Sequence, residues 1–136
     1  MRHLDDDHFD RVLAFNDDQR YAYFVAHACE DRAVYGLADG DDDWLVWGDA
    51  GGERDVFPIW PHPRLAGALA VGELDGFTPA ATDLDEFLRF LDDLQSDGVL
   101  VGVMPYPDGS QLIVEPEDLK RDLEDFRSGK YADVLG

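Results

Sequence analysis

The sequence predicts an α+β fold, in which a mixed, mostly antiparallel sheet of about five to six strands packs with about four to five helices. Some segments place apolar residues at helical spacing, and others are short apolar or aromatic runs bounded by turn residues. No internal repeat, linker or low-complexity segment separates these elements, and 136 residues suffice for one hydrophobic core. We therefore expect residues 1–136 to form a single compact domain.

Two helices are expected at the start of the chain. The first, residues 5–15, opens with acids that favour a helix N-terminus, and its apolar side is formed by Phe9, Val12 and Leu13. Residues 16–18 interrupt it, and Asp17 is the expected N-cap of the second helix. The second helix should bury the clearest apolar stripe in the first half of the chain, which consists of Tyr21, Phe24, Val25 and Ala28.

The pattern then changes from helical to extended. Residues 33–38 and 44–47 are predicted to form a hairpin, because Asp39 and Gly40 begin the acidic turn between them. A second turn leads to a third strand at residues 56–60. Three antiparallel strands in sequence predict a meander.

The third strand leads directly into a short helix. Pro61 and Pro63 cannot continue the strand pairing, whereas Pro63 suits the first turn of a helix, where its missing N–H would have no partner in any case. The helix is therefore expected to begin near His62 and to pack a small apolar face against the sheet: Leu65, Ala66, Leu69 and Ala70. This segment is a packing joint without a catalytic signature.

The most clearly patterned helix lies in the second half. Residues 76–81 can form an edge strand before it, the position in which Pro79 is tolerated. Thr82 and Asp85 resemble a capping box that opens the helix, and Gly98 ends it. Its apolar stripe consists of Leu84, Phe87, Leu88, Leu91 and Leu94.

A strand, a hairpin and a helix complete the chain. Residues 99–104 are a continuous apolar run, which is typical of a central strand buried on both faces. The turn at residues 105–109 leads back to a hairpin strand at residues 111–114. Glu115 and Pro116 open the last helix, whose apolar side is formed by Leu119, Leu123 and Phe126.

Acidic residues dominate the charge of the chain, with 31 Asp and Glu against 11 Lys and Arg and a net charge of −20. Such a charge repels phosphate backbones and anionic lipids, so no direct binding of nucleic acid or of a membrane is expected. Of the acids 24 are Asp, only two lysines are present, and the acids are spread along the whole chain. This pattern favours adaptation to high salt over an acidic decoy that fills the groove of a basic partner.

The sequence also indicates a compartment. Cys29 is the only cysteine, so no intramolecular disulfide can form. The first ten residues lack the apolar core of a secretion signal, and no apolar run approaches the roughly 18 residues that a membrane span needs. We therefore expect a cytoplasmic protein.

No catalytic, cofactor or metal site is predicted. The acidic turn at residues 39–43 has the spacing of the first calcium ligands of an EF-hand, but Trp44 stands where that loop needs Gly and Ala50 where it needs Glu. The remaining histidines, serines and glycines form no motif of zinc binding, nucleophilic catalysis or phosphate binding.

Five ring-bearing side chains form the candidate interaction surface: Trp44, Trp47, Trp60, His62 and Tyr106. For most of the aromatic residues, core and edge packing is the favoured interpretation. His62, held between two prolines, is expected to be structural. A small enzyme that uses His62 with a carboxylate such as Asp55 or Asp108 is the alternative.

The chain resembles a known family. Its most informative stretches are YFVAHACEDRAVYGL, FPIWPHPRLAGALAVGEL and GVLVGVMPYPDGSQLIVEPEDL. Over about residues 20–124, and most specifically at residues 58–62 and 105–109, it is similar to the bacterial and archaeal family called domain of unknown function 2750. That family has no established activity, cofactor or catalytic residues, so the resemblance implies none. A weaker likeness to the N-terminal domain of the SseB family implies a compact sheet-and-helix accessory module.

From these observations we expect a soluble, non-enzymatic accessory or protein-binding module with an unidentified protein partner and no cofactor. The first alternative is an acidic inhibitor or immunity-type protein that blocks a basic nucleic-acid-binding partner. The second alternative is the small enzyme.

Salt adaptation predicts a melting temperature that rises between low and molar potassium chloride, because salt screens the repulsion between the acids. Thermal unfolding followed by circular dichroism across a series of salt concentrations measures this rise. No tight basic partner is expected at physiological salt. A flat salt response, together with nanomolar capture of a nuclease or another DNA-binding protein, would favour the decoy instead.

Overall fold

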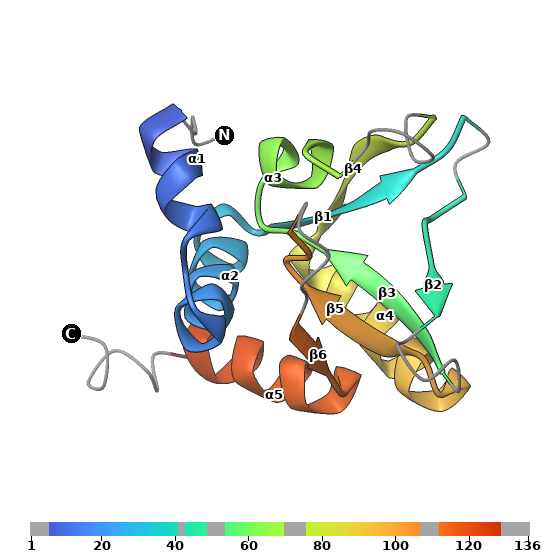
Figure 1. Ribbon diagram of the computed structural model, residues 1–136. Coiled ribbons are helices and arrows are strands. Elements are labelled where there is room, and N and C mark those ends of the chain that lie inside the picture. Colours follow the sequence, from blue (N-terminus) through green and yellow to red (C-terminus); the bar gives the residue numbers. More distant parts are fainter. Residues whose placement is uncertain (1–5, 41–42, 49–53, 70–75, 107–111, 129–136) are drawn as a thin grey trace.

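The computed structural model describes residues 6–40, 43–48, 54–69, 76–106 and 112–128, and all structural statements below concern these residues (Figure 1). They form five helices and six strands, which confirms the predicted α+β class. The strands are divided between two small sheets, one of two strands and one of four, where the sequence predicts one sheet.

The larger sheet has the strand order β2-β3-β5-β6. Its strands are β2 (Trp47–Gly48), β3 (Asp55–Ile59), β5 (Leu100–Val103) and β6 (Leu112–Val114). β5 pairs parallel to β3 and antiparallel to β6, and its Val101 and Val103 are fully buried. The predicted central strand and the hairpin that follows it are therefore confirmed. The parallel pairing of β3 with β5 requires the long crossover that separates them in the chain.

The smaller sheet corrects the predicted meander. β1 (Ala33–Ala38) pairs antiparallel with β4 (Thr78–Asp83) over six residues, whereas it pairs with the following segment only at Ala38 and Trp44. The antiparallel pairing of β2 with β3 is as predicted. β4 lies alongside the whole of β1, whereas the described segment after β1 forms one bridge to it and then pairs with β3 at Trp47 and Gly48. Pro79 lies in β4, which is an edge strand as expected.

Tyr35 and Trp60 join the two sheets. The backbone N–H of each donates to the carbonyl oxygen of the other at 2.8 Å, so the end of β3 runs antiparallel to the middle of β1. Beyond Trp60 the chain leaves the sheet, and α3 (Pro63–Gly67) begins at the predicted proline. The segment is thus the packing joint that the sequence predicts, and the side chains of α3 buried there are Leu65 and Ala66.

The second helix, α2 (Asp17–Asp31), has a different cap from the one predicted. Asn16 is the N-cap: its side chain accepts a hydrogen bond from the backbone N–H of Gln19 at 2.8 Å, and the Gln19 side chain accepts one from the N–H of Asn16 at 3.0 Å. Asn16 takes the position from Asp17 because Gln19 lies three residues later and completes a capping box. The predicted stripe is largely buried, with Tyr21 partly exposed beside Phe24, Val25 and Ala28.

The longest helix of the second half, α4 (Leu84–Asp97), is capped by Asp83 rather than by Thr82. The Asp83 carboxylate accepts a hydrogen bond from the backbone N–H of Asp85 at 3.0 Å. The aspartate at position 85 is one methylene shorter than the glutamate or glutamine of a capping box. Gly98 ends the helix in the left-handed conformation, with φ of 75°, as predicted.

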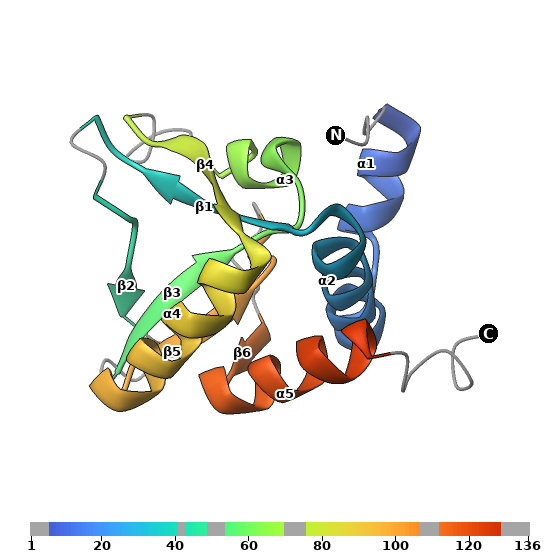
Figure 2. The same cartoon turned by 180° about the vertical axis from the view of Figure 1, so that it is seen from behind.

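Helices cover one face of the larger sheet and one of its sides. α4 lies across the face of β3 and β5, and α5 (Pro116–Arg127) lies beside α4 (Figure 2). Two ion pairs link these helices, Lys120 to Asp92 at 2.9 Å and Arg127 to Asp85 at 2.7 Å. α2 packs against α5, so that the apolar stripes of all three helices contribute to one core.

The first helix, α1 (Asp6–Leu13), is attached to this core through Tyr106. The Tyr106 hydroxyl donates a hydrogen bond to the carbonyl oxygen of Val12. The guanidinium group of Arg20 lies over the Tyr106 ring, 3.7 Å from its centroid, and Arg20 is only 4% exposed. A buried cation therefore contacts the electron-rich face of a buried ring, which is a favourable arrangement.

Arg54 connects three elements at one end of the larger sheet. Its Nε–H donates to the carbonyl oxygen of Gly98 at 2.8 Å, and its Nη1 and Nη2 donate to the carboxylate of Glu115 at 2.8 and 3.3 Å. Glu115 is the residue before α5 and Gly98 the residue after α4, so Arg54 ties the start of β3 to both helices. The hydrogen bond from Arg54 also lowers the pKa of Glu115 below its ordinary value.

Leu88 provides a test of the core. It is buried in the core, so Leu88→Ala should reduce the free energy of unfolding by about 2 to 5 kcal/mol through lost apolar burial and an unfilled cavity. Urea denaturation measures this change. The matched control is Arg89→Ala, an exposed neighbour whose loss should cost no more than about 0.5 kcal/mol. Similar stability of the two variants would contradict this description of the core.

Glu115 provides a test in acid. Because its folded-state pKa lies below the ordinary 4.5, its ionised form contributes stability above that pH, and this contribution disappears as the pH falls through the lower, folded-state value. Glu115→Gln should therefore cost up to about 1 kcal/mol at neutral pH and progressively less as the pH falls below 4.5. Glu117→Gln, in the first turn of the same helix, controls for the helix dipole. An equal pH dependence in both variants would exclude a specific effect of Arg54.

Candidate functional site

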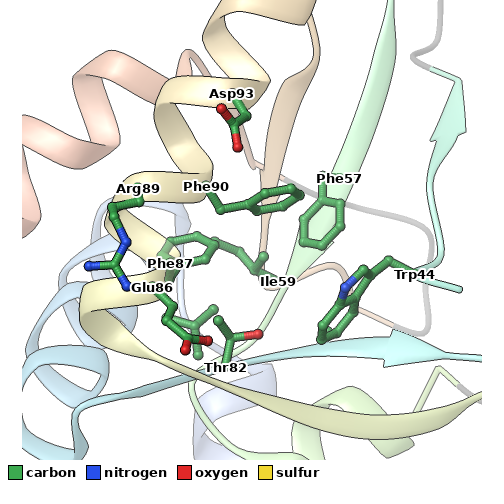
Figure 3. A pocket seen from close by; sticks show the side chains of 11 residues that line it. Trp44, Phe57, Ile59, Thr82, Glu86, Phe87, Arg89, Phe90 and Asp93 are labelled. Atoms are coloured by element: carbon green, nitrogen blue, oxygen red, sulfur yellow. The ribbon is translucent and has the colours of Figure 1, made fainter. Parts of the chain in front are cut away.

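A groove of 330 Å³ opens between β1, β3 and α4 (Figure 3). Its walls are mostly apolar, and α4 supplies the charged side chains that line it. A volume of this size accommodates a side chain or a small organic group, since ligand pockets span roughly 300 to 1,000 Å³. Side chains from β1, the segment after it, β3 and the start of α4 meet in this groove, although they are far apart in the sequence.

Gly36 of β1 allows Trp44 to close one side of the groove. A Cβ at position 36 would lie 2.8 Å from Cζ3 and 2.9 Å from Cε3 of the Trp44 ring, which is closer than such atoms approach. The ring therefore rests on the glycine backbone. Trp44 remains 36% exposed, so part of its side chain stays available to another molecule.

Three aromatic rings continue from this side of the groove to α4. The centroids of Trp44 and Phe57 are 5.8 Å apart, and those of Phe57 and Phe90 are 5.1 Å apart with the rings nearly perpendicular. Figure 3 shows the three rings following one another, with Phe87 and Ile59 deeper in the groove. Both spacings lie in the favourable range for aromatic pairs, so the rings hold one another in place.

Charged side chains of α4 lie on either side of Phe90. Glu86 is four residues before it and Asp93 three residues after it, so both are on the same helix face as the ring. Both carboxylates are exposed, and within the described part of the chain neither forms an ion pair. Arg89 also lines the groove, but its guanidinium group points away from Trp44 and Phe57 (Figure 3).

Of the five residues of the candidate interaction surface, only Trp44 lines this groove. Trp60 is 1% exposed, and its indole N–H donates to the carbonyl oxygen of Pro105 at 3.0 Å, so it belongs to the core. Tyr106 is 4% exposed and belongs to the core too. Trp47 is half-buried in β2. A role of Trp44, Trp47 and His62 in binding a partner stays a prediction.

His62 has the structural role that the sequence predicts. Its Nδ1 accepts a hydrogen bond from the backbone N–H of Arg64 at 3.0 Å, which caps the first turn of α3. Asp55 lies at the opposite end of β3 from the segment that holds His62, so the structure does not bring these two groups together. Asp108, the other carboxylate of the enzyme alternative, lies outside the described residues.

Cys29 is half-buried, and its thiol donates to the carbonyl oxygen of Leu123 at 3.5 Å. Burial raises the pKa of this thiol to about 11, so it is protonated at neutral pH and is a poor nucleophile. Among the described residues, no three His, Cys, Asp or Glu side chains come together in a way that could hold a metal ion.

A larger hollow of 570 Å³ lies between α2, β6 and α5. Polar groups that line it already contact each other, because the Tyr21 hydroxyl donates to Asp122 and Arg121 pairs with Asp118 at 2.9 Å. The aromatic groove is different, since its two carboxylates lie beside apolar rings and form no ion pair with another described residue. We therefore take the aromatic groove as the candidate functional site.

The acidic residues are distributed over several sides of the molecule. Exposed examples are Asp7 on α1, Asp43 after β1 and Asp93 on α4, and further acids lie along α5. α1, α4 and α5 lie on different sides of the fold in both ribbon views (Figures 1 and 2). The acidic runs at residues 5–7 and 41–43 are described only in part, because Asp5, Asp41 and Asp42 lie outside the described residues.

The fold and the groove can now be compared with known proteins. Residues 21–123 match the model of a protein family of unknown function, DUF2750. The chain belongs to the DUF2750 family. The DUF2750 match extends from the second turn of α2 into α5, so it contains both sheets and the whole groove.

Other comparisons add little to the family assignment. No curated protein matches the chain. No helix in the described ranges has the length and apolar character needed to cross a membrane. The weaker likeness to the SseB N-terminal domain stays a prediction.

Proposed function

We propose that this DUF2750 protein is a non-enzymatic accessory module that binds a protein partner through the groove beside Trp44. The observation that carries the proposal is a half-exposed tryptophan seated on a glycine backbone at the side of an apolar groove. Tryptophan side chains in such positions dominate the binding energy of many protein interfaces, because they bury a large rigid surface at little entropic cost.

The chemistry of the groove supports binding rather than catalysis. Apart from Arg89, its polar lining side chains are Thr82, Glu86 and Asp93. The two acidic residues are seven positions apart on one helix, about 10.5 Å along its axis, and lie on either side of the Phe90 ring. Both side chains are exposed, whereas catalytic carboxylates usually lie in clefts that exclude water. A catalytic pair is therefore not favoured.

The distribution of the acids argues against mimicry of nucleic acid. A decoy needs carboxylates along one face at roughly one charge per 1.7 Å of axis. The described acids instead cover several helices on different sides of the fold. An even acidic coat agrees better with a hydrated surface in high salt.

The proposal assigns this module to the cytoplasm of a salt-tolerant organism. Its support is the composition, in which Asp outnumbers Glu and lysine is scarce, together with a fold that contains a single cysteine and does not depend on a disulfide. In such a setting, exposed aromatic contacts remain effective while surface ion pairs are screened.

Capture from the lysate of the source organism, at matched salt, tests the proposal. Immobilised wild-type protein should retain a specific partner, and Trp44→Ala should reduce its retention about tenfold or more, because the central aromatic contact is lost. Gly36→Ala should reduce it as well, since the added methyl group displaces the Trp44 ring.

The matched control is Val46→Ala, which removes a neighbouring exposed apolar side chain outside the groove and should leave retention unchanged. Circular dichroism establishes that all variants are folded. A partner that is retained equally by wild type and Trp44→Ala would overturn the groove as the binding site, and the absence of any specific partner would overturn the proposal.

A further inference from the structure

We propose that the group bound in this groove is the positively charged end of a lysine or arginine side chain, presented by a partner polypeptide. This inference rests on the proposed function and specifies the chemistry that the groove recognises. It follows from the juxtaposition of three aromatic rings with two carboxylates at one narrow site.

The rings provide the first part of the argument. Trp44, Phe57 and Phe90 form a continuous aromatic row, and the indole of Trp44 is the most effective aromatic group for attracting a cation to its face. The methylene stem of a lysine or arginine can pack on the apolar wall while its charged end stays near the rim. A neutral apolar side chain could pack on the apolar wall, but it would not gain the attraction between a cation and the face of the indole ring.

The carboxylates provide the second part. On α4, Asp85 and Asp92 pair with cations of α5 and so connect the two helices. Glu86 and Asp93 are each one residue further along the helix, which turns them toward the groove on either side of Phe90 (Figure 3). Within the described residues neither has a cationic partner, so both are available to one from outside.

Arg89 is the one cation among the described residues that line the groove. Its guanidinium group is directed to the side of α4 that lies away from the rings (Figure 3). The described lining therefore carries two negative charges, on Glu86 and Asp93, against one positive charge. At low ionic strength the net charge of −20 adds a long-range attraction that speeds the approach of a cation, and salt screens this attraction.

The size of the groove limits the occupant to one side chain. A volume of 330 Å³ does not admit a folded segment, and the surrounding acids are spread too evenly to bind a broad basic surface. The inference is therefore a single cationic anchor on a partner that is otherwise not strongly basic. A single cationic anchor agrees with the expectation that no basic protein binds tightly at physiological salt.

Nuclear magnetic resonance titration with three matched probes tests the inference. The probes are Nα-acetyl-lysine amide, Nα-acetyl-arginine amide and the neutral Nα-acetyl-norleucine amide, each added up to about 50 mM. The indole N–H signal of Trp44, assigned by its loss in Trp44→Phe, reports binding. At low salt the two cationic probes should bind at least about fivefold more tightly than the norleucine probe.

Two double variants with the same change of net charge separate a local from a general effect. Glu86→Gln with Asp93→Asn should bring the lysine and norleucine probes to within about twofold of each other. Asp97→Asn with Glu117→Gln removes two acids outside the groove and should preserve most of the preference. An equal loss in both double variants would show a general charge effect and overturn the inference.

The titration distinguishes failure of this inference from failure of the proposed function. Equal binding of the norleucine probe, or no response of Trp44 to any probe, overturns the cationic anchor, while capture of a partner that depends on Trp44 would still support the proposed function. Conversely, a clear preference for the cationic probes supports the anchor site, and if no partner depends on Trp44 the proposed function alone is overturned.

Discussion

Trp60 holds the two sheets of this fold together. Its backbone exchanges two hydrogen bonds with Tyr35 at 2.8 Å, and its indole donates to the carbonyl oxygen of Pro105. The same residue therefore attaches the end of β3 both to β1 and to the segment that follows β5. Because the side chain is almost fully buried, each of these bonds forms where water cannot compete, which makes the loss of any one costly.

This attachment also determines where the groove lies. It holds Gly36 on β1 in a fixed relation to Phe57 on β3, and these positions determine where the Trp44 ring can rest. α4 then closes the opposite side with Phe90. The groove is thus a by-product of the way in which a two-stranded sheet is joined to a four-stranded one.

Local patterns in the sequence were sufficient for much of the fold but not for strand pairing. Helical spacing predicts α2, α4 and α5, and the apolar run around Val101 predicts the central strand. The pairing of β1 with β4 depends on which extended segment presents enough backbone after the chain has folded, and no short-range pattern encodes that. The parallel contact between β3 and β5 likewise depends on the crossover.

The site was harder to predict than the fold. Core packing, the interpretation favoured for most of the aromatic residues, holds for Trp60 and Tyr106, whose polar atoms donate to carbonyl oxygens from distant parts of the chain, at Pro105 and Val12. Phe90 carries a recognisable signal that was missed, since it is an aromatic residue outside the buried stripe of α4. Gly36 gives no local signal, because its importance lies in the space that it leaves for Trp44.

The attachment of α1 has a consequence for any shortened form of this chain. The family match begins at residue 21, after the Asn16 and Gln19 box that caps α2 and after the buried Arg20. A polypeptide that started there would lose the acceptor of the Tyr106 hydroxyl and the cation on its ring, and the capped end of α2 would be removed. The contacts that stabilise this chain extend beyond the region by which its family is recognised, so a shortened form should still include α1.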